Sequence, residues 1–116
     1  MIVATFSFMA TDEVFIERLL EKMRPLEVVA KPMFGEYGLY FNGKNFSLVC
    51  DNTLFIKVTE PGTHFAGKIS KCSPYPGAKP AFRITKAKME DRSWLLELIE
   101  VTSDALPLPK AKKKIR

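Results

Sequence analysis

Two runs of alternating apolar residues flank Asn42-Gly43, and no other feature of the sequence constrains the fold as strongly. The apolar positions are Tyr37, Leu39 and Phe41 before this pair and Phe46, Leu48 and Cys50 after it. Alternation with period two indicates strands that bury one face. Asn-Gly is the strongest short signal for a two-residue hairpin turn, because both residues tolerate positive φ. We therefore predict a β-hairpin in which Leu39 faces Phe46 and Tyr37 faces Leu48.

A further strand is expected at residues 54–58, after a three-residue link at "DNT". This register places Cys50 opposite Leu54 and Leu48 opposite Ile56, so that one face of the sheet stays apolar. The glycines of the region lack the G-x-G-x-x-G and G-x-x-x-x-G-K-[ST] spacings and precede no helix, so they do not indicate a phosphate-binding loop.

The opposite face of the predicted sheet carries Tyr40, Val49 and Phe55. Large exposed apolar patches mark contacts with partners, so these residues are a candidate protein interface, in the simplest case between two copies of the chain. Two alternatives stay open. The three residues are scattered, or they are covered by an N-terminal arm that includes Ile2, Phe6 and Phe8.

The remaining segments predict helices around this sheet. Thr11 is expected to cap a helix with a buried stripe at Ile16, Leu19, Leu20 and Met23, which ends at Pro25. A short helix is expected from Thr59 to Gly67, and a last helix follows Asp91. The predicted class is α+β, a two-layer sandwich of order α-β(3)-α-β(2)-α with an antiparallel five-stranded sheet and helices on one face. Residues 10–106 form this domain, residues 1–9 an arm or extension, and residues 107–116 a basic tail.

The sequence offers no constellation for catalysis. An enzyme needs convergent groups, whereas His64 is the one histidine and has no nameable partner residue, and no acid or histidine near Cys72 would activate its thiol. We predict a protein that is not an enzyme, with no catalytic, cofactor-binding or metal-binding residues. No apolar run approaches the ~20 residues of a membrane helix. Two cysteines make no disulfide framework, so the cytoplasm is expected.

Positive charge is concentrated near the C-terminus. The net charge of +5 equals the charge of the last seven residues, and the other 13 basic residues balance the 13 acidic ones. Residues 61–89 also contain no acid, and if "AFRITKAK" is an exposed edge strand, alternate positions would place several of its basic side chains on one side. Candidate nucleic-acid contacts, able to give salt-sensitive and non-specific affinity, are Lys110, Lys112, Lys113, Lys114, Arg116, Arg83, Lys86 and Lys88. Alternatively, edge lysines prevent aggregation and the tail maintains solubility.

The stretch "MFGEYGLYFNGKNFSLVCDNTLFIKV" resembles the N-terminal domain of the TfoX/Sxy family of competence regulators, over roughly residues 10–105. The matching positions are Met33, Phe34, Gly35, Tyr37, Gly38, Leu39, Tyr40, Asp51, Thr53, Leu54 and Lys57, whereas Glu36 replaces a glycine of the family. The resemblance implies the same α+β order and a transcriptional co-regulator of DNA transformation without catalytic activity, assisting a transcription factor such as the cyclic-AMP receptor protein. Full-length regulators continue into a second, helical C-terminal domain, and we expect this chain to be a stand-alone N-terminal domain.

The function predicted from the sequence is therefore that of a cytoplasmic, non-enzymatic regulator acting through protein contacts, with a basic tail that touches DNA. The first alternative is a non-specific nucleic-acid-binding protein, and the second is an uncharacterised enzyme.

Overall fold

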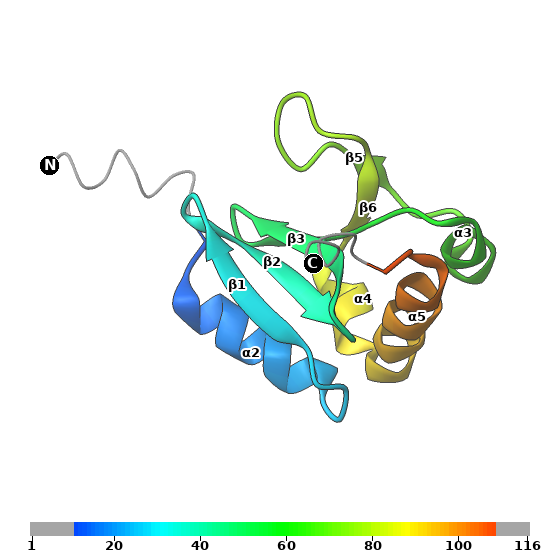
Figure 1. Ribbon diagram of the computed structural model, residues 1–116, viewed down its shortest axis with the longest axis horizontal. Coiled ribbons are helices and arrows are strands. Elements are labelled where there is room, and N and C mark those ends of the chain that lie inside the picture. The colour runs from blue at the N-terminus through cyan, green and yellow to red at the C-terminus, as the bar shows by residue number, and fades with distance from the viewer. Residues whose placement is uncertain (1–10, 109–116) are drawn as a thin grey trace, which may run out of the picture.

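One antiparallel sheet of six strands forms the centre of the structure, a computed structural model that describes residues 11–108. In chain order the elements are α2 (Glu13–Met23), β1 (Val29–Met33), β2 (Glu36–Phe41), β3 (Lys44–Cys50), β4 (Thr53–Ile56), α3 (Glu60–Ala66), β5 (Lys71–Cys72), β6 (Ala81–Ile84), α4 (Lys86–Glu90) and α5 (Arg92–Ala105). The strands lie side by side in the order β1-β2-β3-β4-β6-β5 (Figure 1). The predicted α+β class and antiparallel sheet are confirmed.

The predicted strand number of five is wrong, because four strands rather than three precede α3. Strand β1 pairs with β2 along its whole length although it contains Pro32. Proline is tolerated there because β1 is an edge strand, on which one side of the backbone needs no ladder partner. The short helix α4 was not predicted; Thr85 begins it by accepting a hydrogen bond from the Lys88 N–H.

A β-bulge within the hairpin overturns the predicted register. The turn at Asn42-Gly43 has two residues, as predicted, and Phe41 pairs with Lys44. One step further, Tyr40 pairs with Asn45, but Leu39 pairs with Ser47, so that Phe46 is an extra residue in β3. The predicted pairs Leu39–Phe46 and Tyr37–Leu48 are therefore wrong. An extra residue in one strand exchanges the faces of every residue beyond it.

The turn between β3 and β4 is shorter than predicted. Asp51 and Asn52 form a two-residue turn with φ of 51° and 55°, in place of the three-residue link. Asp and Asn tolerate this left-handed conformation better than most residues. The turn pairs Val49 with Leu54 and Leu48 with Phe55. Since paired residues share a face, Val49 belongs to the core side of the sheet and Leu48 to the opposite side.

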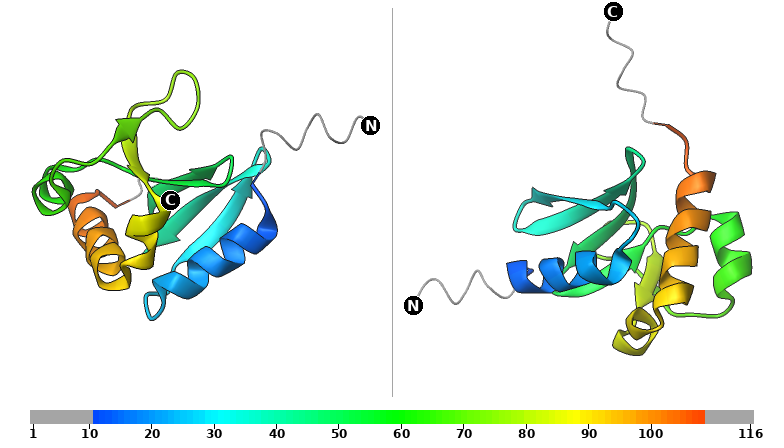
Figure 2. Two further views of the ribbon diagram at one scale, coloured as in Figure 1. Left: turned by 180° about the vertical axis from the view of Figure 1, so that it is seen from behind. Right: turned by 90° about the horizontal axis from the view of Figure 1, so that it is seen from below.

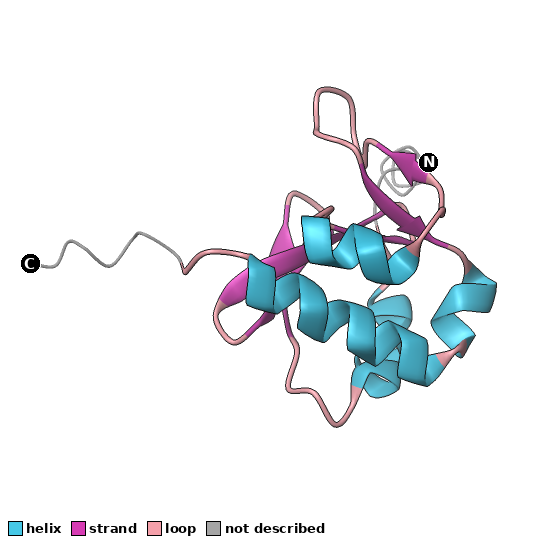
Figure 3. Cartoon of the chain, turned by 90° about the vertical axis from the view of Figure 1, so that its right-hand side faces the viewer, coloured by secondary structure: helices cyan, strands magenta, loops and turns pink. Residues whose placement is uncertain are grey.

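The hydrophobic core lies between one face of the sheet and the helices α2, α4 and α5. Figures 2 and 3 show the arrangement of the sheet and these helices from three directions. The sheet contributes fully or almost fully buried side chains from four strands, and α2 contributes Ile16, Leu19 and Met23 of its predicted stripe. The core residues are Ile16, Leu19, Met23, Leu39, Phe46, Val49, Leu54, Ile56, Phe82, Ile84, Met89, Leu95, Leu98 and Ile99.

Helix α3 packs on α5 and not directly on the sheet centre. Thr59 caps α3 by accepting a hydrogen bond from the Gly62 N–H at 3.0 Å, and Gly67 ends it at φ 72°, both as predicted. Phe65 stacks on Trp94 of α5 with ring centroids 6.1 Å apart. Asp91 begins α5 by accepting from the Trp94 N–H, which confirms that cap. Within residues 11–108, no helix is both long and apolar enough to cross a membrane.

Candidate interaction groove on the outer sheet face

The sheet face opposite the core, here called the outer face, carries a second and smaller apolar cluster. Leu48, Cys50, Phe55 and Ala81 pack together there. The loop of residues 73–80, which joins β5 and β6, places Pro74 and Tyr75 beside this cluster. Tyr75 remains about half exposed, at 51%. A cluster shielded only by one loop is more accessible than the core, which helices cover.

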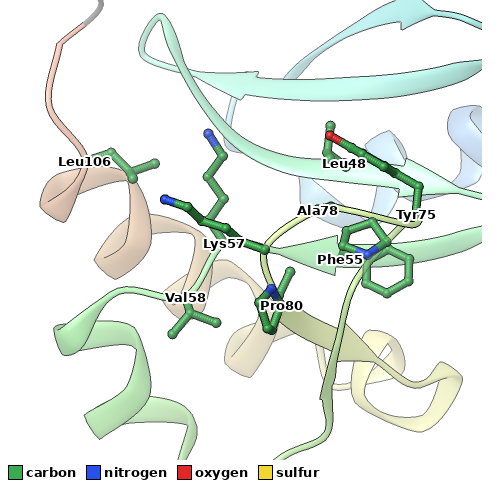
Figure 4. A pocket seen from close by; sticks show the side chains of 11 residues that line it. Leu48, Phe55, Lys57, Val58, Tyr75, Ala78, Pro80 and Leu106 are labelled. Atoms are coloured by element: carbon green, nitrogen blue, oxygen red, sulfur yellow. The ribbon is translucent and has the colours of Figure 1, made fainter.

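Two pockets on the outer face share part of their lining. One has a volume of about 480 Å³ and is bounded by Phe55, Lys57, Val58 and residues 78–81 (Figure 4). The other has a volume of about 530 Å³ and reaches Met33 and Phe34. Leu48, Pro74 and Tyr75 line both. Volumes of 300–1,000 Å³ with mostly apolar walls are typical of binding sites, so we call the two pockets together the groove.

The two ends of the groove carry opposite charge. Lys57, which Figure 4 labels, and Lys79 both line the first pocket. Burial together with the charge of Lys79 lowers the pKa of Lys57. Glu36 and Asp51 lie at the other end. There, burial and these two carboxylates raise the pKa of the Cys50 thiol to about 11. Cys50 is therefore protonated at neutral pH and is a wall residue, since the thiolate is the nucleophilic form.

Phe34 at the rim of the groove combines full exposure with an unfavourable backbone. Its side chain is 100% exposed, and its φ is 51° in the tight turn between β1 and β2. For a bulky residue this left-handed conformation costs about 1–2 kcal/mol relative to the right-handed one. Neither a backbone preference of phenylalanine nor burial of its ring accounts for this residue type at position 34. Such an outlier is grounds for a functional hypothesis.

Three hydrogen bonds fix the Glu36 end of the groove. The Thr11 hydroxyl donates to Glu36 Oε1 at 2.6 Å and accepts from the Asn52 N–H at 3.2 Å. Glu36 Oε1 also accepts from the Asp51 N–H at 3.0 Å. The start of α2, strand β2 and the β3–β4 turn are joined in this way. Thr11 is therefore a tertiary contact and not the predicted cap of α2, whose first flanking residue is Asp12.

The predicted interface residues do not form one exposed patch. Tyr40 lies on the outer face, where Lys31 Nζ approaches its ring centroid to 4.7 Å. Phe55 also lies on the outer face, but it is only 6% exposed. Val49 is fully buried in the core, so its prediction as an outer-face residue is wrong, because of the bulge. The groove residues that the sequence analysis missed are Leu48, Cys50, Phe34 and Tyr75.

The candidate nucleic-acid contacts are distributed over separate elements. Arg83 lies on the outer face, and its strand β6 lies between β4 and β5, so the condition of an exposed edge strand is not met. Lys86 and Lys88 belong to helix α4, and Lys88 Nζ lies 4.9 Å from the ring centroid of Trp94. Lys110, Lys112, Lys113, Lys114 and Arg116 lie outside the described residues. Nucleic-acid contact stays a prediction.

Residues with metal-binding side chains are dispersed in the described part of the chain. Among residues 11–108, no three His, Cys, Asp or Glu side chains gather closely enough to hold a metal ion. His64 lies in the last turn of α3, and Cys72 is an exposed free thiol of β5.

Comparison with known proteins identifies relatives of the chain. The family model described as the TfoX N-terminal domain matches residues 19–106. An uncharacterised 12.7 kDa protein from the region 5′ of trpE in Spirochaeta aurantia is 36% identical over 106 residues, which cover 90% of this chain and 91% of that protein.

Proposed function

Because the chain belongs to the TfoX N-terminal domain family, we propose that it is a competence-related regulator that binds a partner protein through the groove. The family is not one of enzymes, and we extend this to the chain by proposing that it has no catalytic activity. We further propose that it acts in the cytoplasm. The core helices pack on the opposite face of the sheet, which leaves the outer face available for the partner.

The composition of the groove supports a protein partner. Protein interfaces have a desolvated apolar centre with aromatic residues and a polar rim. Here Leu48 and Tyr75 lie between the two pockets, while Lys57 and Glu36 lie toward opposite ends. Opposite charges at the two ends favour one orientation of the bound segment, because electrostatic complementarity chiefly determines specificity and register.

Phe34 is the single observation on which the proposal mainly rests. A fully exposed phenylalanine at positive φ loses free energy locally, and contact with a partner would recover it by burying the ring. Large aromatic side chains are typical interface anchors. In the family resemblance this residue belongs to the matching motif, so the proposed anchor and the family signature coincide.

The test compares Phe34→Asn with Val14→Gln. Asparagine tolerates positive φ, so the first variant removes the ring while preserving the turn. Val14 is exposed on α2 to 55%, outside both groove pockets, and supplies the control. The partner to assay is the cyclic-AMP receptor protein, with and without promoter DNA. We expect Phe34→Asn to weaken capture at least about fivefold, as truncating an anchor costs more than about 1 kcal/mol. Equal capture by both variants would refute the groove as the binding surface.

Self-association is the alternative use of the same surface. Sedimentation of the full chain over a range of concentrations separates the two cases. A dimer abolished by Phe34→Asn, with no binding of the cyclic-AMP receptor protein, would assign the groove to homodimerisation.

Contact with DNA is the second candidate function, and the charge distribution favours it. Five positive charges in residues 110–116 are available to neutralise phosphates. Retention of DNA that falls steeply with salt, and that deletion of residues 110–116 abolishes, would support this function. Retention that the deletion leaves unchanged would argue against the tail.

A further inference from the structure

We infer that the groove binds an extended segment of the partner protein that carries an acidic, an apolar and a basic residue at alternate positions. The acidic side chain meets Lys57 and Lys79 of one pocket. The basic side chain meets Glu36 and Asp51 of the other. The apolar side chain lies between them, against the residues that line both pockets. The inference rests on the proposed function, because it specifies the chemistry of the segment that the groove binds.

The two lysines of the groove have no counter-ion in the described part of the chain. Among residues 11–108 the one ion pair joins Lys22 to Glu90, and neither of these lines the groove. Burial and the charge of Lys79 lower the pKa of Lys57, so the pocket as it stands disfavours its own ammonium groups. A carboxylate placed between them would favour the charged forms. The pocket is therefore complementary to an acidic side chain.

The carboxylates of the other pocket keep acceptor capacity for a cation. Glu36 Oε1 accepts from the Thr11 hydroxyl and from the Asp51 N–H. No described residue donates a hydrogen bond to Glu36 Oε2 or to the Asp51 carboxylate. The two hydrogen bonds hold the Glu36 side chain in place before a ligand arrives, which lowers the entropic cost of binding. A guanidinium with several donors suits such a pair of carboxylates.

The strand register gives the distance between the two charged sites. Lys57, the residue after β4, donates its N–H to the Phe46 carbonyl and so lies level with Phe46 of β3. Glu36 of β2 lies level with Cys50 of β3. Positions 46 and 50 are separated by ~13 Å along the strand, and β4 and β2 by two spacings of ~4.8 Å across it. The diagonal is about 16 Å, and its midpoint falls at Leu48.

An extended segment matches this diagonal when its charges are four residues apart. Neighbouring side chains of an extended chain point to opposite sides, so only even spacings place both charges against the groove. Charges two residues apart are ~7 Å apart, four residues ~13 Å and six residues ~20 Å. The long side chains of Lys57 and Glu36 bridge the difference of ~3 Å for the spacing of four. The residue midway then lies over Leu48, which lines both pockets together with Tyr75.

Short peptides test the charge pattern without any other protein. The isotope-labelled full chain is titrated with acetyl-Ser-Glu-Ser-Phe-Ser-Arg-Ser-amide and with the same peptide in reversed order, and the backbone amide shifts of the groove are followed by NMR. The control peptide, acetyl-Ser-Glu-Ser-Phe-Arg-Ser-Ser-amide, has the same composition but places its arginine on the other side of the extended chain. We expect the better of the two orders to bind at least about fivefold more tightly than the control.

Charge reversal in the chain identifies the contact. Lys57→Glu combined with Lys79→Glu should weaken binding of the better peptide at least about fivefold, and replacing the glutamate of that peptide with lysine should restore it. Lys68→Glu combined with Lys86→Glu changes the net charge equally outside both pockets and should leave the affinity unchanged. Trp94 fluorescence in denaturant checks that each chain is folded.

Two results with the peptides would overturn the inference. The first is equal affinity for the control peptide and both orders of the probe, or an equal loss in the two double variants. The second is a set of groove shifts that change with the concentration of the chain before any peptide is added, which would assign the groove to a second copy.

The proposed function can fail separately from this inference. The peptide titration contains no other protein, so absence of capture by the cyclic-AMP receptor protein would contradict only the choice of partner. Capture that Phe34→Asn weakens, but that Lys57→Glu with Lys79→Glu leaves unchanged, would keep the groove as the binding surface and overturn the charge pattern alone.

Discussion

Truncating two neighbouring residues of β3 tests the bulge, because the bulge decides which of them is in the core. Val49 is fully buried among core residues, whereas Leu48 is half-buried on the outer face. Val49→Ala removes two carbons, worth about 1.6 kcal/mol of transfer free energy. The cavity left in a tightly packed core raises the expected loss of unfolding free energy to about 2–3 kcal/mol. Leu48→Ala removes three carbons, but from a half-exposed site, for about 1 kcal/mol.

The order of the two losses is the informative quantity. If the strands paired without a bulge, Leu48 would be the core residue and its larger truncation would cost about 3–4 kcal/mol, against less than 1 kcal/mol for Val49→Ala. Urea denaturation monitored by Trp94 fluorescence gives both free energies, and the thermal midpoints should differ by about 4–8 °C per kcal/mol. Leu48→Ala being the more destabilising substitution would refute the register.

Three further substitutions test the packing and the electrostatics. In Gly62→Ala the new Cβ would lie 2.8 Å from Thr59 Oγ1 and 3.3 Å from Thr102 Oγ1; we expect a loss of about 1–2 kcal/mol by urea denaturation despite the better helix propensity of alanine, and increased stability would contradict this packing. Thr102 Oγ1 is buried with no hydrogen-bond partner among the described residues, so Thr102→Val should raise the unfolding free energy by about 1 kcal/mol, whereas a comparable decrease would reveal a missed partner. The folded-state pKa of Cys50 is raised from 9.0 to about 11, so between these values the folded chain holds the thiol proton that the unfolded chain releases; in a Cys72→Ser background, the stability of the chain relative to its Cys50→Ala variant should be constant below pH 9 and fall between pH 9 and 11, and a relative stability that does not change over this range would contradict the raised pKa.

Local signals in the sequence predicted α2, α3, α5 and the Asn42-Gly43 turn, but not α4 or the length of the Asp51-Asn52 turn. Proline after α2, the Thr59 and Asp91 caps, and Gly67 at the end of α3 act on their own neighbours, so their effect is visible without the tertiary structure. The Asn42-Gly43 turn is local in the same sense.

The bulge escaped prediction because its causes are long-range or hidden in polar residues. Asn45 Nδ2 donates to the carbonyls of Leu39 and Ser47, both at 3.0 Å, and so bridges the two strands at the irregularity. Ser47 is fully buried, with its hydroxyl donating to the Phe55 carbonyl at 2.7 Å. A serine and an asparagine read as solvent-facing in a pattern of apolar residues, and the unbroken alternation of Phe46, Leu48 and Cys50 therefore indicated the wrong face.

The candidate site was predicted only in outline for the same reason. The sequence indicated an apolar outer face containing Phe55. Because of the bulge, Val49 lies in the core and Leu48, not Val49, lies on the outer face. The loop that brings Tyr75 to this face was predicted only as an irregular segment. Phe34 was recognised as part of a family motif, but its exposure and its positive φ follow from the tight turn with Gly35, which only the structure shows.

The most direct test of the account is an NMR titration of the labelled chain with the cyclic-AMP receptor protein. The account predicts that the backbone amide shifts that change belong to the groove, at Phe34, Leu48 and Tyr75, while those along α2 and α5 stay in place. Changes confined to α2 and α5, or no changes at all at saturating partner concentration, would contradict the claim that the outer face of the sheet is the binding surface.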